Sequence, residues 1–265
     1  MGESDLVNRR QIGFFDTRII KTSDVGPVEQ HTYKYSLKLP KFLHEWDVYD
    51  YWEKERLFSL DKHLSKGDTF YDVGAEHGWL PALIAKYIVG GDAMVLLEPT
   101  PEFWPNIKAI WEENGLDDPL FCIQALIGEE TTDDAFFEQS MADKSWPKVA
   151  VSDMLVPKLS YRYLHEKSHV DTTPQITIDD MVKYGVKPPK AINVDVEGAE
   201  IHVMKGAKET LLKYRPLCWI SVHPDLGIKN YNTTPEEFHA FMESCGYKKT
   251  YLATDHEEHW LYEPL

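Results

Sequence analysis

Hydrophobic positions along the chain change period repeatedly, from strict alternation to the spacing of an amphipathic helix. Residues 31–40 alternate tyrosine and leucine with polar residues, which predicts a strand. Residues 47–64 have helical spacing, and a polar turn then leads into a short apolar run. Residues 1–30 show no clear period, so a disordered arm and a strand lying on the domain are both open.

From residue 70 onward, strand and helix patterns alternate. The pattern predicts strands at 70–74, 93–98, 120–128, 191–196 and 216–223, and helices at 79–89, 101–114, 177–185, 199–214 and 234–246. Such alternation predicts an α/β fold, with a mostly parallel sheet and helices on both faces. Two last strands, 248–254 and 256–263, are separated by a turn short enough for a hairpin, so one of them is antiparallel.

The alternation breaks over residues 129–174, which form a polar excursion with little periodicity. A long insertion of this kind is more often a functional loop or lid than a core element. Its aromatic residues Trp146, Tyr161 and Tyr163 fit either a stacking surface for a sugar ring or a local hydrophobic cluster.

Composition indicates one large globular domain, with 265 residues of which 43% are hydrophobic and 27% charged. We expect an N-terminal extension, strand plus helix, over residues 1–60, packed on a domain over residues 61–265.

No apolar run approaches the roughly 20 residues of a membrane span, and the polar N-terminus does not resemble a secretory signal. Cys122, Cys218 and Cys245 are widely spaced in apolar surroundings, which favours buried free thiols. A cytoplasmic protein fits best.

The charge balance is strongly acidic, with a formal net charge of −16. Such a surface repels phosphate backbones, and no stripe of lysine or arginine locally reverses it. Nucleic acid is therefore not an expected partner, and neither is a membrane.

The segment "FYDVGAEHGW" predicts a strand, a glycine turn and the start of a helix, an arrangement that binds nucleotide-like cofactors. A dinucleotide turn has the pattern G-x-G-x-x-G, whereas this chain has only Gly74 and Gly78. Glu76 would place a carboxylate beside any bound phosphate. S-adenosylmethionine has an ammonium and a sulfonium but no phosphate, so it suits this turn better.

Other residues complete the expected donor site. Asp72 ends the first strand, and His77 lies in the turn. Glu98 ends the next strand, where its carboxylate can accept both ribose hydroxyls. We expect Ala125 or Ile127, in "QALIG", near the adenine. The alternative is a strand–turn–helix unit whose acidic residues merely cap helices.

A second group of polar residues follows two later strands. Asp195 and Glu197 end one strand at i, i+2 spacing, and His223 and Asp225 end what should be its neighbour. His223 could deprotonate an acceptor hydroxyl. Alternatively, Asp195, Glu197 and His223 could hold a divalent ion such as Mg²⁺ that lowers the pKa of the hydroxyl. The competing interpretation is that Glu197 and Glu200 cap the next helix and that His223 is a core histidine.

The segments "FYDVGAEHGW", "LLEPTPEFWPNI", "QITIDDM", "INVDVEGAEIHVMKGA" and "ISVHPD" resemble those of FkbM-type methyltransferases. The resemblance extends from Tyr51 to Tyr247. It implies a Rossmann-like class I methyltransferase fold with a seven-stranded sheet and an antiparallel last strand. It also implies O-methylation, often of a sugar or polyketide hydroxyl. The chain departs from the family at Glu76, where asparagine is common, and at Asn193, where lysine is common.

Together these features predict an S-adenosylmethionine-dependent O-methyltransferase acting on a hydroxyl of a sugar, glycan or related small molecule. Asp195, Glu197 and His223 are the expected catalytic residues. Two alternatives are an NAD-dependent oxidoreductase on a similar sheet and a non-enzymatic interaction module. Nothing in the sequence names the acceptor or the oligomeric state.

Overall fold

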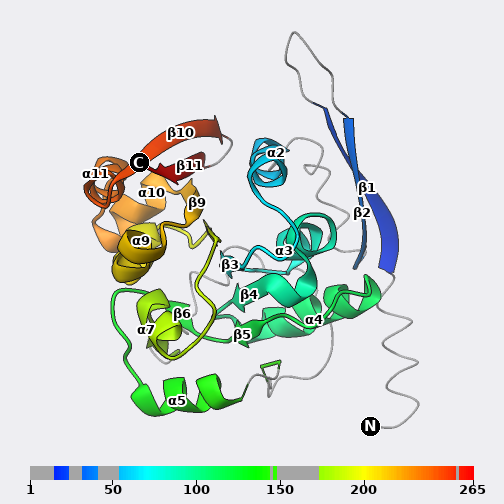
Figure 1. Cartoon of the computed structure of the whole chain (residues 1–265), viewed down its shortest axis with the longest axis horizontal. Helices are drawn as coiled ribbons and strands as arrows, with labels where there is room; N and C mark the ends of the chain where they lie inside the picture. The colour runs from blue at the N-terminus through cyan, green and yellow to red at the C-terminus, as the bar shows by residue number, and fades with distance from the viewer. Residues whose placement is uncertain (1–14, 24–31, 41–53, 144–145, 148–172, 255–256) are drawn as a thin grey trace.

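The computed structural model describes residues 15–23, 32–40, 54–143, 146–147, 173–254 and 257–265. Its main strands are β3 (Phe70–Val73), β4 (Met94–Leu97), β5 (Phe121–Ile123), β8 (Ala191–Val194), β9 (Leu217–Val222), β10 (Tyr247–Thr254) and β11 (Glu258–Pro264). They form one seven-stranded sheet in the order β10-β11-β9-β8-β3-β4-β5 (Figure 1). Strand β11 is antiparallel to both of its neighbours, while β9, β8, β3, β4 and β5 pair in parallel. The predicted fold class is confirmed.

Helices cover both faces of the sheet. The longer ones are α3 (Trp79–Ile84), α4 (Trp104–Glu113), α7 (Ile178–Lys183), α8 (Glu200–Lys205), α9 (Lys208–Tyr214) and α11 (Pro235–Ser244). Short helical segments continue or connect these elements: η3 (Ala85–Val89), η4 (Gly91–Ala93), η5 (Pro101–Phe103), α10 (Pro224–Leu226) and η6 (Gly227–Tyr231). Strand residues alternate between two buried clusters: Phe70 packs on the side of α3 and α4, and Tyr71 on the side of α7 to α11. The central strands are therefore apolar on both faces, as parallel strands between helices must be. The helix predicted over 199–214 is two helices, broken at Gly206, whose backbone packs against Gly128.

The N-terminal elements pack beside the sheet. Strands β1 (Phe15–Ser23) and β2 (Thr32–Pro40) form an antiparallel ribbon alongside α3 and α4 (Figure 1). Leu37 and Leu39 of β2 are fully buried and Lys38 between them is exposed, so the predicted alternation is confirmed for residues 37–39. Residues 15–23 are a strand rather than a disordered arm. Helix α2 (Lys54–His63) is the described part of the predicted helix, and residues 47–53 lie outside the described residues.

The strand predicted over 120–128 is wrong as a single element. Strand β5 ends at Ile123, and the following β6 (Leu126–Ile127) pairs with β7 (Gln175–Ile176) in a separate parallel sheet. Because β6 precedes the excursion and β7 follows it, this pairing closes the base of the excursion. An apolar run alone could not reveal the change of partner.

The described part of the excursion contains a helix that periodicity did not predict. Asp133 is the N-cap of helix α5 (Asp134–Ala142), and its side chain accepts a hydrogen bond from the Phe136 amide. The Trp146 ring lies 6.5 Å from that of Trp104 and 6.2 Å from that of Trp111, so it belongs to a hydrophobic cluster. Tyr161 and Tyr163 lie outside the described residues.

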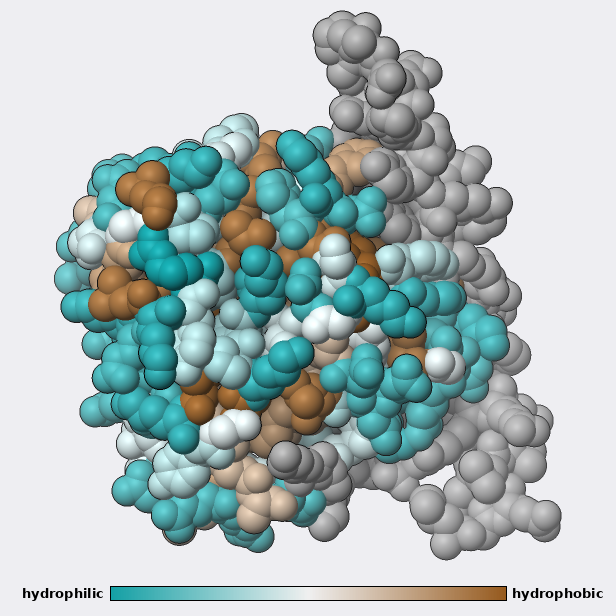
Figure 2. Space-filling view, in the orientation of Figure 1, coloured by the Kyte–Doolittle hydropathy of each residue, from teal (hydrophilic) through white to brown (hydrophobic). Residues whose placement is uncertain are grey.

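The surface agrees with the composition. Figure 2 shows one face that is largely hydrophilic, with hydrophobic residues in separate patches. Cys122, Cys218 and Cys245 are buried and free, as expected. Within the described parts of the chain, no helix has both the length and the apolar character to cross a bilayer.

Candidate active site

The glycine turn connects β3 to α3 at the carboxyl edge of the sheet. Gly74 (φ 90°) and Gly78 (φ 84°) both adopt the left-handed conformation that favours glycine. A Cβ atom on Gly74 would lie 1.9 Å from the Asp195 carbonyl oxygen. The missing side chain therefore lets the glycine turn contact the loop that follows β8. This edge is also the switch point of the sheet, since the chain proceeds from β3 to β4 on one side and later to β8 on the other.

Glu98 follows β4, and hydrogen bonds from two backbone amides hold its carboxylate against the glycine turn. One carboxylate oxygen accepts a hydrogen bond from the Glu76 amide at 2.9 Å, and the other from the Thr100 amide at 2.7 Å. A carboxylate oxygen can accept more than one hydrogen bond, so this fixed group could also receive ribose hydroxyls. Burial raises the pKa of Glu98 to about 7.

Glu76 places a carboxylate in the turn despite a backbone conformation that is unfavourable for it (φ 47°). Burial, followed by the charges of Glu98, Glu197 and Glu257, raises the pKa of Glu76 to about 8. These like charges repel one another, and a bound cation would relieve the repulsion. The structure thus places the Glu76 carboxyl group in the glycine turn, as the sequence predicted.

Asp72 lies beneath the turn, almost fully buried at the end of β3. Its Oδ1 accepts a hydrogen bond from the Asn193 side-chain amide at 2.8 Å. Burial raises the pKa of Asp72 to about 6, while this hydrogen bond and the charge of Arg56 lower it in part. Asn193, noted in the sequence only as a departure from the family, is thus a direct partner of the predicted donor residue.

The other predicted donor residues are packed in the interior. His77 is buried, its Nδ1 lies 2.8 Å from the Asn106 side-chain nitrogen, and burial lowers its pKa to about 4, so the ring is neutral. Ala125 is fully buried just past β5, whose Ile123 carbonyl accepts the Glu98 amide at 3.2 Å. Ile127 lies in β6, which is not a strand of the seven-stranded sheet, and its side chain packs into the core cluster on one face of that sheet.

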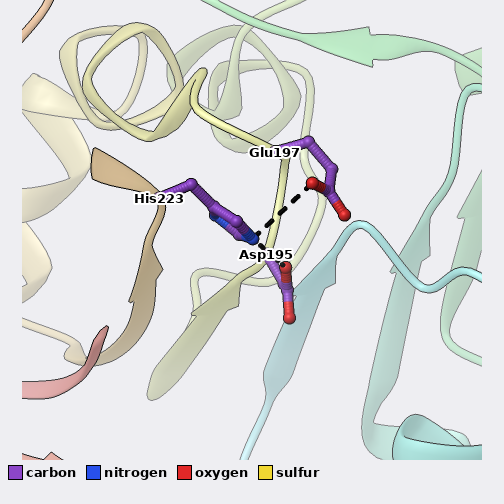
Figure 3. Close-up of side chains that lie close together, drawn as sticks. All are labelled: Asp195, Glu197 and His223. Carbon is purple, nitrogen blue, oxygen red and sulfur yellow. Dashed lines mark ion pairs between the residues drawn. The ribbon is translucent and has the colours of Figure 1, made fainter. Parts of the chain in front are cut away.

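Asp195, Glu197 and His223 converge as the sequence predicted (Figure 3). His223 Nε2 lies 3.7 Å from a carboxylate oxygen of Asp195 and 3.7 Å from one of Glu197. The predicted reason for the convergence was wrong, because Glu197 has φ 55° and lies in a turn rather than in an extended segment. Asp225 is exposed in α10, outside this cluster.

His223 is held between two further glutamates. Its Nδ1 lies 2.8 Å from Glu200, which also accepts the Gly198 amide at 2.9 Å, and its Nε2 contacts the Glu257 carboxylate. Burial opposes a charge on the ring, but the hydrogen bonds to Glu200 and Glu257 outweigh it and raise the pKa of His223 well above its ordinary value. A protonated ring cannot accept a proton, so this geometry argues against the predicted role of His223 as a free base.

Sequence reasoning missed four residues that complete the site: Arg56, Ser221, Glu257 and His259. Ser221 donates a hydrogen bond to Asp195 at 3.2 Å, and His259 Nδ1 lies 3.3 Å from the Ser221 hydroxyl. Strand alternation could have placed Ser221 and His259 on one face of the sheet. No comparable signal exists for Arg56, which resembles any other polar residue of an amphipathic helix.

Comparison with known proteins settles the family. The methyltransferase FkbM domain matches residues 72–249, which is more than half of the chain. The chain belongs to the FkbM methyltransferase family. No curated protein matches it.

A solved structure of an FkbM methyltransferase has the same fold. Over 76% of this FkbM-family chain, the methyltransferase FkbM from Methylobacillus flagellatus KT superposes with a TM-score of 0.50 and 17% identity. The chain spans 44% of the length of that protein. A putative rRNA-methylase from Clostridium thermocellum has a TM-score of 0.44 and 14% identity, covering 79% of this chain and 93% of that one. TYW2 from M. jannaschii, in complex with AdoMet, has a TM-score of 0.39 and 11% identity, and the match covers 94% of this chain and 88% of that one.

Proposed function

We propose that this protein transfers a methyl group from S-adenosylmethionine to a hydroxyl of a sugar, glycan or related small molecule. One observation supports this most strongly: the glycine turn touches the loop of the acidic cluster through Gly74 and the Asp195 carbonyl. A donor bound on the turn and an acceptor bound at the cluster would therefore be neighbours. Alignment of the two reactants supplies much of the acceleration in such a reaction.

The donor side fits a cation that has no phosphate. Glu98 offers a fixed carboxylate for ribose hydroxyls, and a bound cation would favour ionisation of Glu76, whereas a pyrophosphate bound at the same turn would oppose it. S-adenosylmethionine has a methyl group on a positively charged sulfur. An acceptor oxygen can attack the methyl carbon directly, while the carbon–sulfur bond breaks and S-adenosylhomocysteine leaves. This charge pattern disfavours the oxidoreductase alternative.

On the acceptor side, Asp195 is better placed than His223 to take the hydroxyl proton. Its side chain is 28% exposed, whereas that of His223 is 3% exposed. The Ser221 hydroxyl and the His223 ring fix the carboxylate from two sides. The charged ring of His223, itself held by Glu200 and Glu257, would orient the acceptor oxygen.

A divalent ion is the second route to the same chemistry. Asp195, Glu197 and His223 each offer a ligand atom, and all of these lie within 4.8 Å of one another. Carboxylate and imidazole ligands suit Mg²⁺ or Mn²⁺, and such an ion would lower the pKa of a bound hydroxyl. His223 would first have to release its Nε2 proton, which Glu257 stabilises. Transfer assays with and without chelator separate the two routes.

The acceptor class and the cellular setting are also part of the proposal. The net charge of −16 and the carboxylates of the cluster favour a neutral acceptor over nucleic acid. Three buried free thiols favour a reducing compartment, and so the cytoplasm.

Calorimetric titration tests the donor site. We expect S-adenosylhomocysteine to bind saturably and NAD not to bind. Glu98→Gln should weaken S-adenosylhomocysteine binding by about 10-fold or more, because one fixed carboxylate oxygen and its charge are lost. Asp225→Asn is the matched control, since this acidic residue is exposed outside the cluster, and it should bind as the wild type does. A folded protein that binds NAD, or that does not bind S-adenosylhomocysteine, contradicts the proposed function.

A further inference from the structure

Arg56 is the one buried lysine or arginine among the side chains that the structure describes, with 1% exposure. It comes from α2 and lies under the carboxyl edge of the sheet. Burying a guanidinium is costly unless charges and hydrogen-bond acceptors surround it. Several of its contacts come from three adjacent strands and the loops beside them. They include Asn193 Oδ1 at 3.1 Å, His259 Nδ1 at 2.7 Å, the Ser221 hydroxyl, and the carboxylates of Asp195 and Glu257 at 3.7 Å.

One of these contacts connects Arg56 to Asp72 at the predicted donor site. Arg56 donates to Asn193 Oδ1, and the Asn193 amide nitrogen then donates to Asp72 at 2.8 Å. A carboxamide has an acceptor on one side and donors on the other. If the Asn193 amide turned over, its nitrogen would face the guanidinium and its oxygen would face the Asp72 carboxylate. Arg56 therefore fixes which way this amide points.

We propose that Arg56 is a positioning residue for the donor site: its guanidinium orients the Asn193 amide, which in turn orients the Asp72 carboxylate. This inference rests on the proposed function, because the orientation of Asp72 affects binding only if the donor lies on that turn. Arg56 acts through other side chains, since its own guanidinium is covered. It also lies outside residues 72–249, the part that matches the family domain.

Binding of S-adenosylhomocysteine to substituted full-length protein tests the inference. Arg56→Met should weaken binding about 10-fold, and Asn193→Ala by a similar factor. If Arg56 acts through Asn193, the double variant should lose about 10-fold rather than about 100-fold. Arg56→Lys keeps the charge but not the planar fork, so it should bind between the wild type and Arg56→Met.

Arg215→Met is the control for simply losing a structural arginine. Arg215 donates to the Cys245 and Gly246 carbonyls at 2.8 and 2.7 Å, away from the site, so its loss should leave affinity unchanged. Wild-type affinity in folded Arg56→Met, or independent losses in the double variant, overturns the inference while the proposed function stands. No binding by wild-type protein overturns the function itself. If Arg56→Met does not fold, the cycle of Arg56→Lys with Asn193→Ala gives the same comparison.

Discussion

At the scale of single residues, the site contains carboxyl groups whose burial disfavours the charged form. Asp72, Glu76 and Glu98 all have raised pKa values, chiefly because they are buried. The sequence could predict these three residues because each lies at a strand end or in a glycine turn. It could not predict the raised pKa of His223, which depends on hydrogen bonds to Glu200 and to Glu257, 34 residues further along the chain.

The raised pKa of Glu98 predicts a pH dependence of donor binding. A cationic donor is bound best by ionised carboxylates, and Glu98 loses its proton near pH 7. Affinity for S-adenosylmethionine should therefore rise by about 10-fold between pH 6 and pH 8, measured by calorimetry. In Glu98→Gln this rise should be smaller, and the part that remains would come from Asp72 and Glu76, whose pKa values of about 6 and about 8 fall in the same range. An affinity that stays level or falls over this range would mean that Glu98 does not titrate in the donor site.

At the scale of elements, the decisive feature is the contact between the turn after β3 and the loop after β8. The sequence could predict both segments, since each follows an apolar strand and contains glycine. It could not show that they touch, because pairing between β3 and β8 depends on the topology of the whole sheet. The same limit explains the error over 120–128, where β6 leaves the main sheet for a partner beyond the excursion.

Gly74→Ala tests this contact. The added Cβ would meet the Asp195 carbonyl at 1.9 Å, so we expect a loss of about 3 kcal/mol or more in the free energy of unfolding, together with weaker S-adenosylhomocysteine binding. Gly67 has the same φ of 90° but no atom within 4 Å of its added Cβ. Gly67→Ala should therefore cost only about 1–2 kcal/mol, from backbone strain alone. Urea unfolding compares the two; equal losses would show that the turn and the loop are not in close contact.

At the scale of the whole molecule, segments on both sides of the family domain complete the site. Arg56 comes from α2 before it, and His259 comes from β11 after it; the two are 203 residues apart in sequence and lie 2.7 Å apart in the fold. The alternating strands and helices made the architecture predictable. A contact between such distant residues leaves no local pattern, so no reading of periods or motifs could have found it.

The most direct test of the whole account is a crystal structure of the protein with S-adenosylhomocysteine bound. We predict that the ligand lies on the Gly74–Gly78 turn, with its ribose hydroxyls about 2.5–3.0 Å from the Glu98 carboxylate. Its sulfur should face Asp195 and His223 across the contact between turn and loop. A ligand bound elsewhere, or one whose sulfur points away from Asp195, would contradict the claim that donor and acceptor meet at this edge of the sheet.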